Sequence, residues 1–431
     1  MVRNFEAFRD EFEFSMVRPT QISNSLPDVA REMGWRSEIG AVAAVFGANA
    51  SGKSTFFRAL AQIVRDVNAL PNRAAHGKPF LLDDTHRLEP TEFEITFIAD
   101  SIDGAGQKSE YSYAYSVLEN VIVQEQLYAR VCAPKKQWRM VFARERDDTS
   151  FDGCKYVWGT LMRGQKDLIR KLTKSGELFL ASSSRFPEDP LLAVSNWFAS
   201  SIEFFSANRY QQALPQIARR LEGGDEKFSE SLNRFLRAAD LGICGIHVEH
   251  LPNQYYEAIR QKVAKISEEV NIDIDELIEN ETTYLVYEHR SGASAVHLRQ
   301  EQESEGTVAM TAFASIALQA LNVGGTLVID ELDTSLHPLL VRKLVEQFAD
   351  PESNPNQAQL IFTTHDITLM LDSPGISRPL ERDQIWLTEK DREGAATMVS
   401  LWDFDPRKGE DIFHRYLLGR YGAIASPVVP R

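Results

Sequence analysis

The second half of the chain alternates short apolar runs with segments whose apolar residues recur every three or four positions. The apolar runs lie at 326–329, 359–363, 385–388 and 397–401, and the helical spacing at 310–321, 341–348 and 411–418. Strands that are buried on both faces of a parallel sheet are continuously apolar. Such alternation of strand and helix predicts an α/β layer with parallel strands.

The first half adds two further patterns. An apolar run at 39–46 leads into a glycine-rich loop and then into helical spacing over 54–67. Alternation at 92–99, followed by strand-like segments at 111–118 and 121–130 with a turn at Asp103-Gly104 before them, predicts an antiparallel β meander. Phe5, Phe8, Phe12 and Phe14 alternate with charged residues, which favours an early strand or hairpin.

Between about 164 and 280 the pattern becomes helical, most clearly at 228–239 and 255–270, and strands resume at 283–288 and 296–298. We therefore expect three parts. Residues 1–160 form an N-terminal lobe with the glycine-rich loop and the meander, 161–281 a helical insertion, and 282–431 a C-terminal lobe.

Composition changes this picture little. The chain has 431 residues, of which 43% are hydrophobic, and no run approaches the roughly 18 apolar residues of a membrane span. The N-terminus has no apolar signal segment, and Cys132, Cys154 and Cys244 show no metal-ligand spacing. A reduced cytoplasmic protein without a membrane partner is the expectation.

The net charge of −15 disfavours a surface covered with nucleic-acid contacts, but it leaves room for a local basic groove. Candidates are Lys135-Lys136 with Arg139, and the segment that holds Lys166, Arg170 and Lys171. Solvated helix faces explain the same charges.

The loop after the apolar run matches the P-loop pattern G-x-x-x-x-G-K-[ST] in full. It reads Gly47-Ala48-Asn49-Ala50-Ser51-Gly52-Lys53-Ser54, followed by Thr55. Its glycines let successive backbone N–H groups surround phosphates, and the helix that follows adds its positive end. Lys53 is suited to the β and γ phosphates of ATP, and the Ser54 hydroxyl to Mg²⁺. The strand before and the helix after make this pattern specific.

The apolar run 326–329 ends in two carboxylates, Asp330 and Glu331. Placing two charges at the tip of a buried strand is costly unless they have partners. Asp330 fits a Mg²⁺ ligand of the outer shell, and Glu331 fits the general base that polarises an attacking water. A long insertion separates them from the P-loop.

Further polar residues follow neighbouring elements. His365 comes after the run 359–363, at the carboxyl end where parallel sheets bind ligands, and is suited to sensing a γ-phosphate. His337 either caps the next helix or belongs to an interface. Glu303-Ser304-Glu305-Gly306-Thr307 opens a helix with an anion-receptive N-terminus, which in isolation is only a cap.

In this order the motifs resemble the ABC-type ATPase head of SMC-like and MutS-like proteins, over most of residues 1–60 and 280–431. The resemblance implies an ABC-type P-loop NTPase head carrying an antiparallel β meander and an inserted helical subdomain, using ATP with Mg²⁺. It further implies that Ser304 and Gly306 act as a signature motif on the ATP of a partner in a homodimer or higher homo-oligomer. Asp333 would lie in the D-loop, Glu331 would be the catalytic base, and His365 the switch histidine.

Softer patterns are similar to the bacterial AAA family ATPases that include the RloA/AbiLi-type abortive-infection proteins. They are the opening at 4–10, the segments 46–54 and 235–243, and the ending at 419–424. This resemblance implies a nucleotide-driven switch in antiphage defence, triggered by DNA or a phage protein and working with a separate effector such as a Toprim-like nuclease.

Some features limit these inferences. Gln62, Gln124 and Gln126 are all candidates for the Q-loop glutamine, and the signature lacks the paired glycines of transporter heads. Asp403-Phe404-Asp405 matches the Asp-x-Asp of a metal-dependent nuclease, but a polar turn explains it better. A DNA-repair or DNA-clamp ATPase of the SMC type is the alternative, although the insertion is short for long coiled-coil arms.

Overall fold

A computed structural model of the chain describes residues 1–19, 39–104, 107–131, 137–149, 153–187, 189–239, 242–252, 282–291, 294–334, 336–372, 378–405 and 411–423. The chain divides into two compact units. The first unit comprises Met1–Phe204, Val328–Asp330 and Gln359–Arg431, and the second comprises Phe205–Leu327 and Glu331–Ala358.

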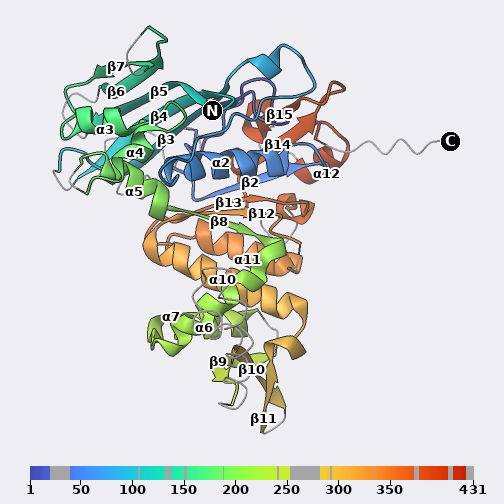
Figure 1. Cartoon of the computed structure of the whole chain (residues 1–431). Helices are drawn as coiled ribbons and strands as arrows, with labels where there is room; N and C mark the ends of the chain where they lie inside the picture. The colour runs from blue at the N-terminus through green and yellow to red at the C-terminus, as the bar shows by residue number, and fades with distance from the viewer. Residues whose placement is uncertain are drawn as a thin grey trace, which may run out of the picture. The chain divides into compact units, whose positions relative to one another are not determined.

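The first unit contains a six-stranded antiparallel sheet of order β1-β3-β4-β5-β6-β7 (Figure 1). Its strands are β1 (Val2–Arg3), β3 (Thr91–Asp100), β4 (Lys108–Leu118), β5 (Val121–Val131), β6 (Arg139–Arg146) and β7 (Cys154–Trp158). The predicted meander is therefore confirmed as β3 to β5. The sequence did not indicate β6 and β7, because β6 buries Arg144 among its apolar residues and so breaks the expected alternation.

A second six-stranded sheet has the order β15-β14-β2-β13-β12-β8. Its strands are β2 (Val42–Gly47), β8 (Ile202–Ser206), β12 (Thr326–Asp330), β13 (Gln359–Thr363), β14 (Ile385–Lys390) and β15 (Ala396–Ser400). The central strand β2 pairs in parallel with both β13 and β14, and β15 pairs antiparallel with β14. The mixed α/β architecture with parallel strands is therefore confirmed.

Helix α2 (Lys53–Val67) packs its apolar face into the core of the first unit, where Phe56, Ala59 and Ile63 are almost fully buried. Asp66 near its end accepts hydrogen bonds from the hydroxyl of Tyr115 on β4 (2.8 Å) and from Gln62 (2.8 and 2.9 Å). The helix that follows the P-loop is thereby tied to the antiparallel sheet. The side-chain amide of Gln62, one of the three Q-loop candidates, donates both of its hydrogen bonds here to Asp66.

The other helices of the first unit are shorter. They are α3 (Lys166–Leu172), α4 (Phe179–Ser183), α5 (Leu192–Ser200) and α12 (Ile412–Leu417), with 3-10 turns η1 (His86–Leu88), η4 (Ile367–Met370), η5 (Arg382–Gln384) and η6 (Leu401–Phe404).

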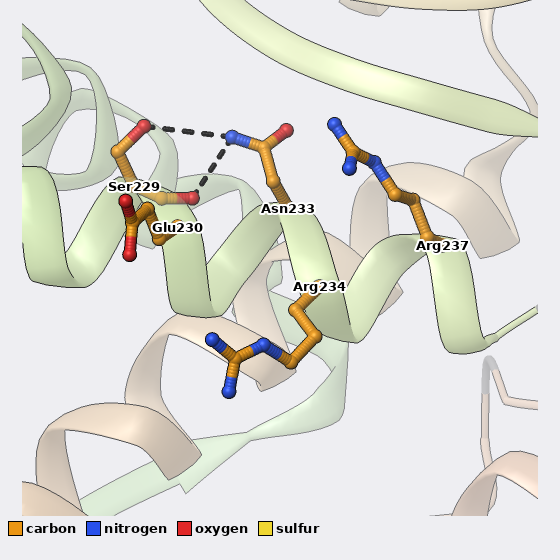
Figure 2. Close-up of a pocket in the computed structure, with 5 residues that line it drawn as sticks. All are labelled: Ser229, Glu230, Asn233, Arg234 and Arg237. Atoms are coloured by element: carbon orange, nitrogen blue, oxygen red, sulfur yellow. Dashed lines mark hydrogen bonds between the residues drawn. The ribbon is translucent and has the colours of Figure 1, made fainter.

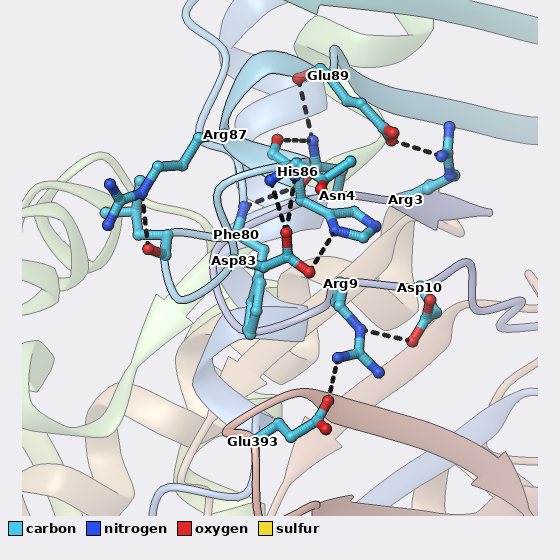
Figure 3. Close-up of polar contacts among 12 residues, drawn as sticks. Arg3, Asn4, Arg9, Asp10, Phe80, Asp83, His86, Arg87, Glu89 and Glu393 are labelled. Atoms are coloured by element: carbon cyan, nitrogen blue, oxygen red, sulfur yellow. Dashed lines mark hydrogen bonds and ion pairs between the residues drawn. The ribbon is translucent and has the colours of Figure 1, made fainter.

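The N-terminal segment forms hydrogen bonds and an ion pair with the loop before β3 (Figure 3). Asn4 is fully buried at φ 51°, and its amide donates to the carbonyls of His86 (2.8 Å) and Glu89 (3.0 Å) while its oxygen accepts from Phe80 N (2.8 Å). Arg3 adds an ion pair with Glu89 at 2.7 Å. The early phenylalanines join this packing, with isolated bridges Val2–Phe12 and Phe5–Phe8 in place of a long hairpin.

The second unit packs helices against a three-stranded antiparallel sheet of order β11-β10-β9. Its elements are η2 (Ala207–Ala213), α6 (Leu214–Glu222), α7 (Glu226–Ala238), β9 (Ile243–His250), β10 (Thr283–Ser291), β11 (Ser294–Arg299), η3 (Gln300–Gln302), α10 (Glu305–Val323) and α11 (Pro338–Ala349). Helix α10 is long and apolar enough by composition to cross a membrane, yet 72% of that window is buried, as in a core helix.

Two side chains of helix α7 form hydrogen bonds with the backbone of β9. Asn233 accepts a hydrogen bond from Ile246 N (2.9 Å), and Arg237 donates to Cys244 O (2.6 Å). These two side chains also line a cavity of about 350 Å³ along α7, together with Ser229, Glu230 and Arg234 (Figure 2).

The two units divide the chain at other points than the expected lobes. Residues 161–204 belong to the first unit, and the range 161–281 contains strands β8 and β9 beside its helices. Helix α7 corresponds to the helix expected at 228–239. The helix expected at 255–270 lies outside the described residues, as do Lys135 and Lys136.

Candidate functional site

The P-loop joins β2 to α2 through a turn in which Gly47 has no room for a side chain. A Cβ on Gly47 would lie 2.4 Å from Oγ1 of Thr388 and 2.5 Å from its carbonyl oxygen. Ala50 and Gly52 then adopt φ angles of 62° and 119°, and α2 begins at Lys53. The glycines of the motif are thus required both by space and by backbone conformation.

Lys53 is folded into its own loop. The side chain is buried, and its Nζ donates to the carbonyls of Gly47 (2.9 Å) and Ala48 (3.0 Å). The first turn of α2 carries no acidic residue, so the positive end of the helix is not neutralised there. A loop with an ammonium group at a bare helix N-terminus is suited to binding an anion.

Two hydroxyl groups approach the same carboxylate oxygen of Asp330, the last residue of β12. Thr363 Oγ1 donates to its Oδ1 at 2.7 Å, and Ser54 Oγ lies 3.4 Å from the same atom. The second distance exceeds the usual 2.5–3.0 Å of an O–H···O bond, so Ser54 is only weakly held. The hydroxyl and the carboxylate together offer the hard oxygen ligands that Mg²⁺ prefers.

Two threonines of this site were not among the predicted residues. Thr363 ends β13, and Thr388 on β14 shares a 2.6 Å hydrogen bond with Ser51 of the P-loop while donating to Phe46 O at 3.2 Å. Both close an apolar run that the sequence had identified as a strand. A polar residue at the carboxyl end of a parallel strand was the available signal.

His365 lies two residues beyond β13, in the first unit like the P-loop. It is exposed, whereas Thr364 before it is fully buried and donates its N–H to Val45 O at 3.1 Å. The backbone at the end of β13 is therefore fixed against β2, and the imidazole projects from a rigid position.

Glu331 opens the next segment, which belongs to the second unit. Its φ angle is 57°, a left-handed conformation that costs a non-glycine residue energy and that is concentrated at functional sites. Its backbone carbonyl accepts from Thr334 N (3.1 Å), and Asp333 lies within the same turn.

Ser304 is the N-cap of α10, accepting a hydrogen bond from Thr307 N at 3.1 Å, and Gly306 is the second residue of the helix. Ser304 is exposed. A cavity of about 770 Å³ in the second unit lies beside it and is lined by Glu303 and Glu305 among others. His337 caps α11 through Leu339 N (3.3 Å), which is the first of the two roles considered for it.

Asp403 and Asp405 are exposed in and just after η6, with Asp405 at φ 45°. This geometry is that of a polar turn.

The mixed α/β sheet around β2 and the P-loop between β2 and α2 are those of a P-loop NTPase fold. In comparison with family models, residues 164–372 match one described as "AAA domain, putative AbiEii toxin, Type IV TA system". The matched range is just under half of the chain and includes Ser304, Asp330 and His365, but not the P-loop. Curated proteins gave no match.

Solved structures that resemble the chain include two Smc heads. One, a Smc head bound to the C-terminal winged-helix domain of ScpA, has 14% identity and a TM-score of 0.36 over 93% of this chain and 95% of that one. The other, a Smc head domain with an extended coiled coil bound to the C-terminal domain of ScpA derived from Pyrococcus furiosus, has 15% identity and a TM-score of 0.29, over 85% and 92%.

Proposed function

We propose that this chain binds ATP with Mg²⁺ at the P-loop and hydrolyses it to ADP and phosphate. The observation that carries the proposal is the meeting of Ser54 and Thr363 at Oδ1 of Asp330. An arrangement of hydroxyl and carboxylate beside a P-loop lysine is what phosphoryl transfer requires, because its catalysis consists of positioning and charge stabilisation.

Each residue then has a defined task. Lys53 exchanges its two carbonyl partners for the β and γ phosphates, and the backbone N–H groups of 48–52 surround them. Ser54 and Asp330 would hold Mg²⁺, which would neutralise phosphate charge. Glu331 accepts the proton of the attacking water, and His365 contacts the γ-phosphate.

We further propose that hydrolysis serves as a switch in a homodimer or higher homo-oligomer. Ser304 is exposed and Gly306 is half-exposed at the start of the long, largely buried helix α10. A signature motif that acts on a partner's ATP has to be accessible in this way. Asp333 would lie at the same interface. The Ser304 hydroxyl, now a helix cap, would be shared with the γ-phosphate.

The biological setting that we propose is antiphage defence with a separate effector, such as a Toprim-like nuclease, and with DNA or a phage protein as trigger. The family description that names an AbiEii toxin and a type IV toxin–antitoxin system supports this setting.

The test compares Lys53→Ala and Glu331→Gln with wild type in ATP binding, phosphate release and oligomeric state. Lys53→Ala should lose binding. Glu331→Gln should bind ATP, lower turnover by about 100-fold or more, and accumulate as an ATP-bound dimer. Lys78→Ala, which removes a lysine that pairs with Glu6 on the surface, is the control and should behave like wild type.

Unchanged turnover in both site variants would refute the site assignment. Defence is tested separately, by plating a phage panel on cells with the gene, its deletion and the Glu331→Gln allele. ATP turnover without any effect on phage would support the proposed ATP hydrolysis but refute the proposed role in defence. Stimulation by DNA ends without a partner would instead favour the SMC-type alternative.

A further inference from the structure

The three-stranded sheet of the second unit gathers two histidines and two glutamates on one face. The register pairs Gly245 on β9 with Glu288 on β10, and Glu288 with His297 on β11. His247 and Glu249 follow Gly245 at intervals of two along β9. Because side chains alternate along a strand, all four acidic and imidazole groups project from the same face.

Three of these groups converge. Ligand atoms of His247, Glu249 and His297 all lie within 4.8 Å of one another. Nε2 of His247 is 3.4 Å from Oε1 of Glu249, and the two imidazole rings are 5.3 Å apart at 71°. The usual N–H···O distance is about 2.9 Å. Ligands at about 2.0–2.1 Å from a tetrahedral ion lie about 3.3 Å apart, which is close to the 3.4 Å between Nε2 of His247 and Oε1 of Glu249.

The remaining groups orient this trio. Nδ1 of His247 is buried without a hydrogen bond among the described residues, and it lies 3.2 Å from Oε1 of Glu288. The Glu288 side chain can reach Nδ1 of His247 because it passes over Gly245, which has no side chain. A Cβ at Gly245 would lie 2.9 Å from Oε2 of Glu288. Tyr284 donates to Oε2 of Glu249 at 3.3 Å, which leaves Oε1 facing His247.

We propose that His247, Glu249 and His297 bind a divalent transition metal of the zinc class, with Glu288 as the positioning residue for His247. Two imidazole nitrogens and one carboxylate oxygen suit Zn²⁺ or Co²⁺, whereas Mg²⁺ prefers oxygen ligands alone. Binding through Nε2 turns Nδ1–H of His247 toward Glu288, which is the usual support of a metal-bound histidine. Three protein ligands leave a fourth position open to water.

The metal links the outer strands of the sheet. His247 stands on β9 and His297 on β11, and from β11 the chain runs through η3 directly to Ser304. The ion therefore fixes the strand that leads into α10, independently of nucleotide. Since it binds the folded sheet and not the unfolded chain, it raises the melting temperature of the protein.

The test uses the full chain, treated with a chelator and kept free of nucleotide and Mg²⁺. Co²⁺ is titrated and followed by its visible absorption, and Zn²⁺ is then added as a competitor. Wild type should bind one Co²⁺ with tetrahedral absorption and release it to Zn²⁺. His247→Ala and His297→Ala should lose this signal, and Glu288→Gln should weaken affinity by about 10–100-fold.

His250→Ala is the matched control, because His250 also stands on β9 but pairs with Glu222 away from the trio. It should bind Co²⁺ like wild type. Melting temperatures without metal show that each variant is folded. At saturating Zn²⁺ the wild-type, His250→Ala and Glu288→Gln proteins should gain stability, and the His247→Ala and His297→Ala proteins should not. The proposal is overturned if wild type shows no saturable binding, or if the His247 and His297 variants bind and are stabilised like wild type.

Discussion

Thr363 donates a hydrogen bond of 2.7 Å to Oδ1 of Asp330 from the neighbouring strand of the sheet. A hydrogen bond to a charged group contributes about 1.5–3 kcal/mol, and it holds the carboxylate in one orientation. Ser54 approaches the same oxygen from α2. The position of the proposed Mg²⁺ ligand is therefore set by β13 as well as by β12.

Thr363→Val removes this donor while keeping the shape of the side chain. We expect the Mg²⁺ concentration for half-maximal ATP turnover to rise about tenfold, because the Asp330 carboxylate is no longer oriented. Titrating Mg²⁺ at saturating ATP measures this change. Thr363→Ser keeps the hydroxyl and should stay close to wild type. An equal loss in both variants would show that the threonine acts by packing alone.

Gly47→Ala tests the tight contact between the P-loop and β14. The added Cβ would meet the backbone of Thr388 at 2.5 Å, so the loop must shift and nucleotide binding should be lost. Crowding of this kind typically costs about 1–3 kcal/mol of stability. Gly104→Ala is the control, since Gly104 also has a positive φ, of 72°, but no atom of the described residues lies within 4 Å of the added Cβ. It should bind ATP normally in a fluorescent-nucleotide titration.

The sequence was most informative where local chemistry decides the structure. The P-loop glycines and the apolar runs predicted β2, α2, β12 and β13 to within a few residues. Strand β6 could not be found that way, because the apolar pattern cannot anticipate that Arg144 is buried against a glutamate from β5. The contacts of Thr363 and Thr388 arise from strand order, which a single sequence does not specify.

The stability contributed by Asp66 should depend on pH. Burial raises the pKa of its carboxyl above the usual 3.8, although Gln62 and Tyr115 partly oppose this effect. The folded state therefore holds this proton more tightly than the unfolded chain. The stabilisation is present at pH values below the unfolded-state pKa, and it is lost as the pH rises through the pKa of the folded state.

Asp66→Asn removes this titration. The melting temperature of the Asp66→Asn protein minus that of wild type should increase as the pH rises from about 4 to about 8. Differential scanning fluorimetry across this range measures the difference. In the control Asp350→Asn, the difference should stay nearly flat, because the hydroxyl of Ser353 and backbone N–H groups lower the pKa of the Asp350 carboxyl below its usual value. A constant difference for Asp66→Asn would contradict the buried titration.

Arg144 and Glu125 form an ion pair of 2.8 Å inside the antiparallel sheet, with side chains 1% and 0% exposed. Glu125 also accepts hydrogen bonds from Tyr113 (2.8 Å) and from the backbone N–H of Phe179 (2.8 Å) and Leu180 (3.0 Å). The carboxylate thus anchors the start of α4 to the sheet. Every one of its partners depends on its negative charge or its acceptor oxygens.

Arg144→Met should lower stability by about 3–5 kcal/mol, because it leaves the Glu125 carboxylate buried without a countercharge. Adding Glu125→Gln should recover part of the loss, since the amide oxygen still accepts from α4 while no charge remains to be desolvated. Urea denaturation of wild type, both single variants and the double variant gives the coupling energy directly. Simple additivity would show that the pair is not coupled, and that the cost of Arg144→Met comes from lost packing around the guanidinium.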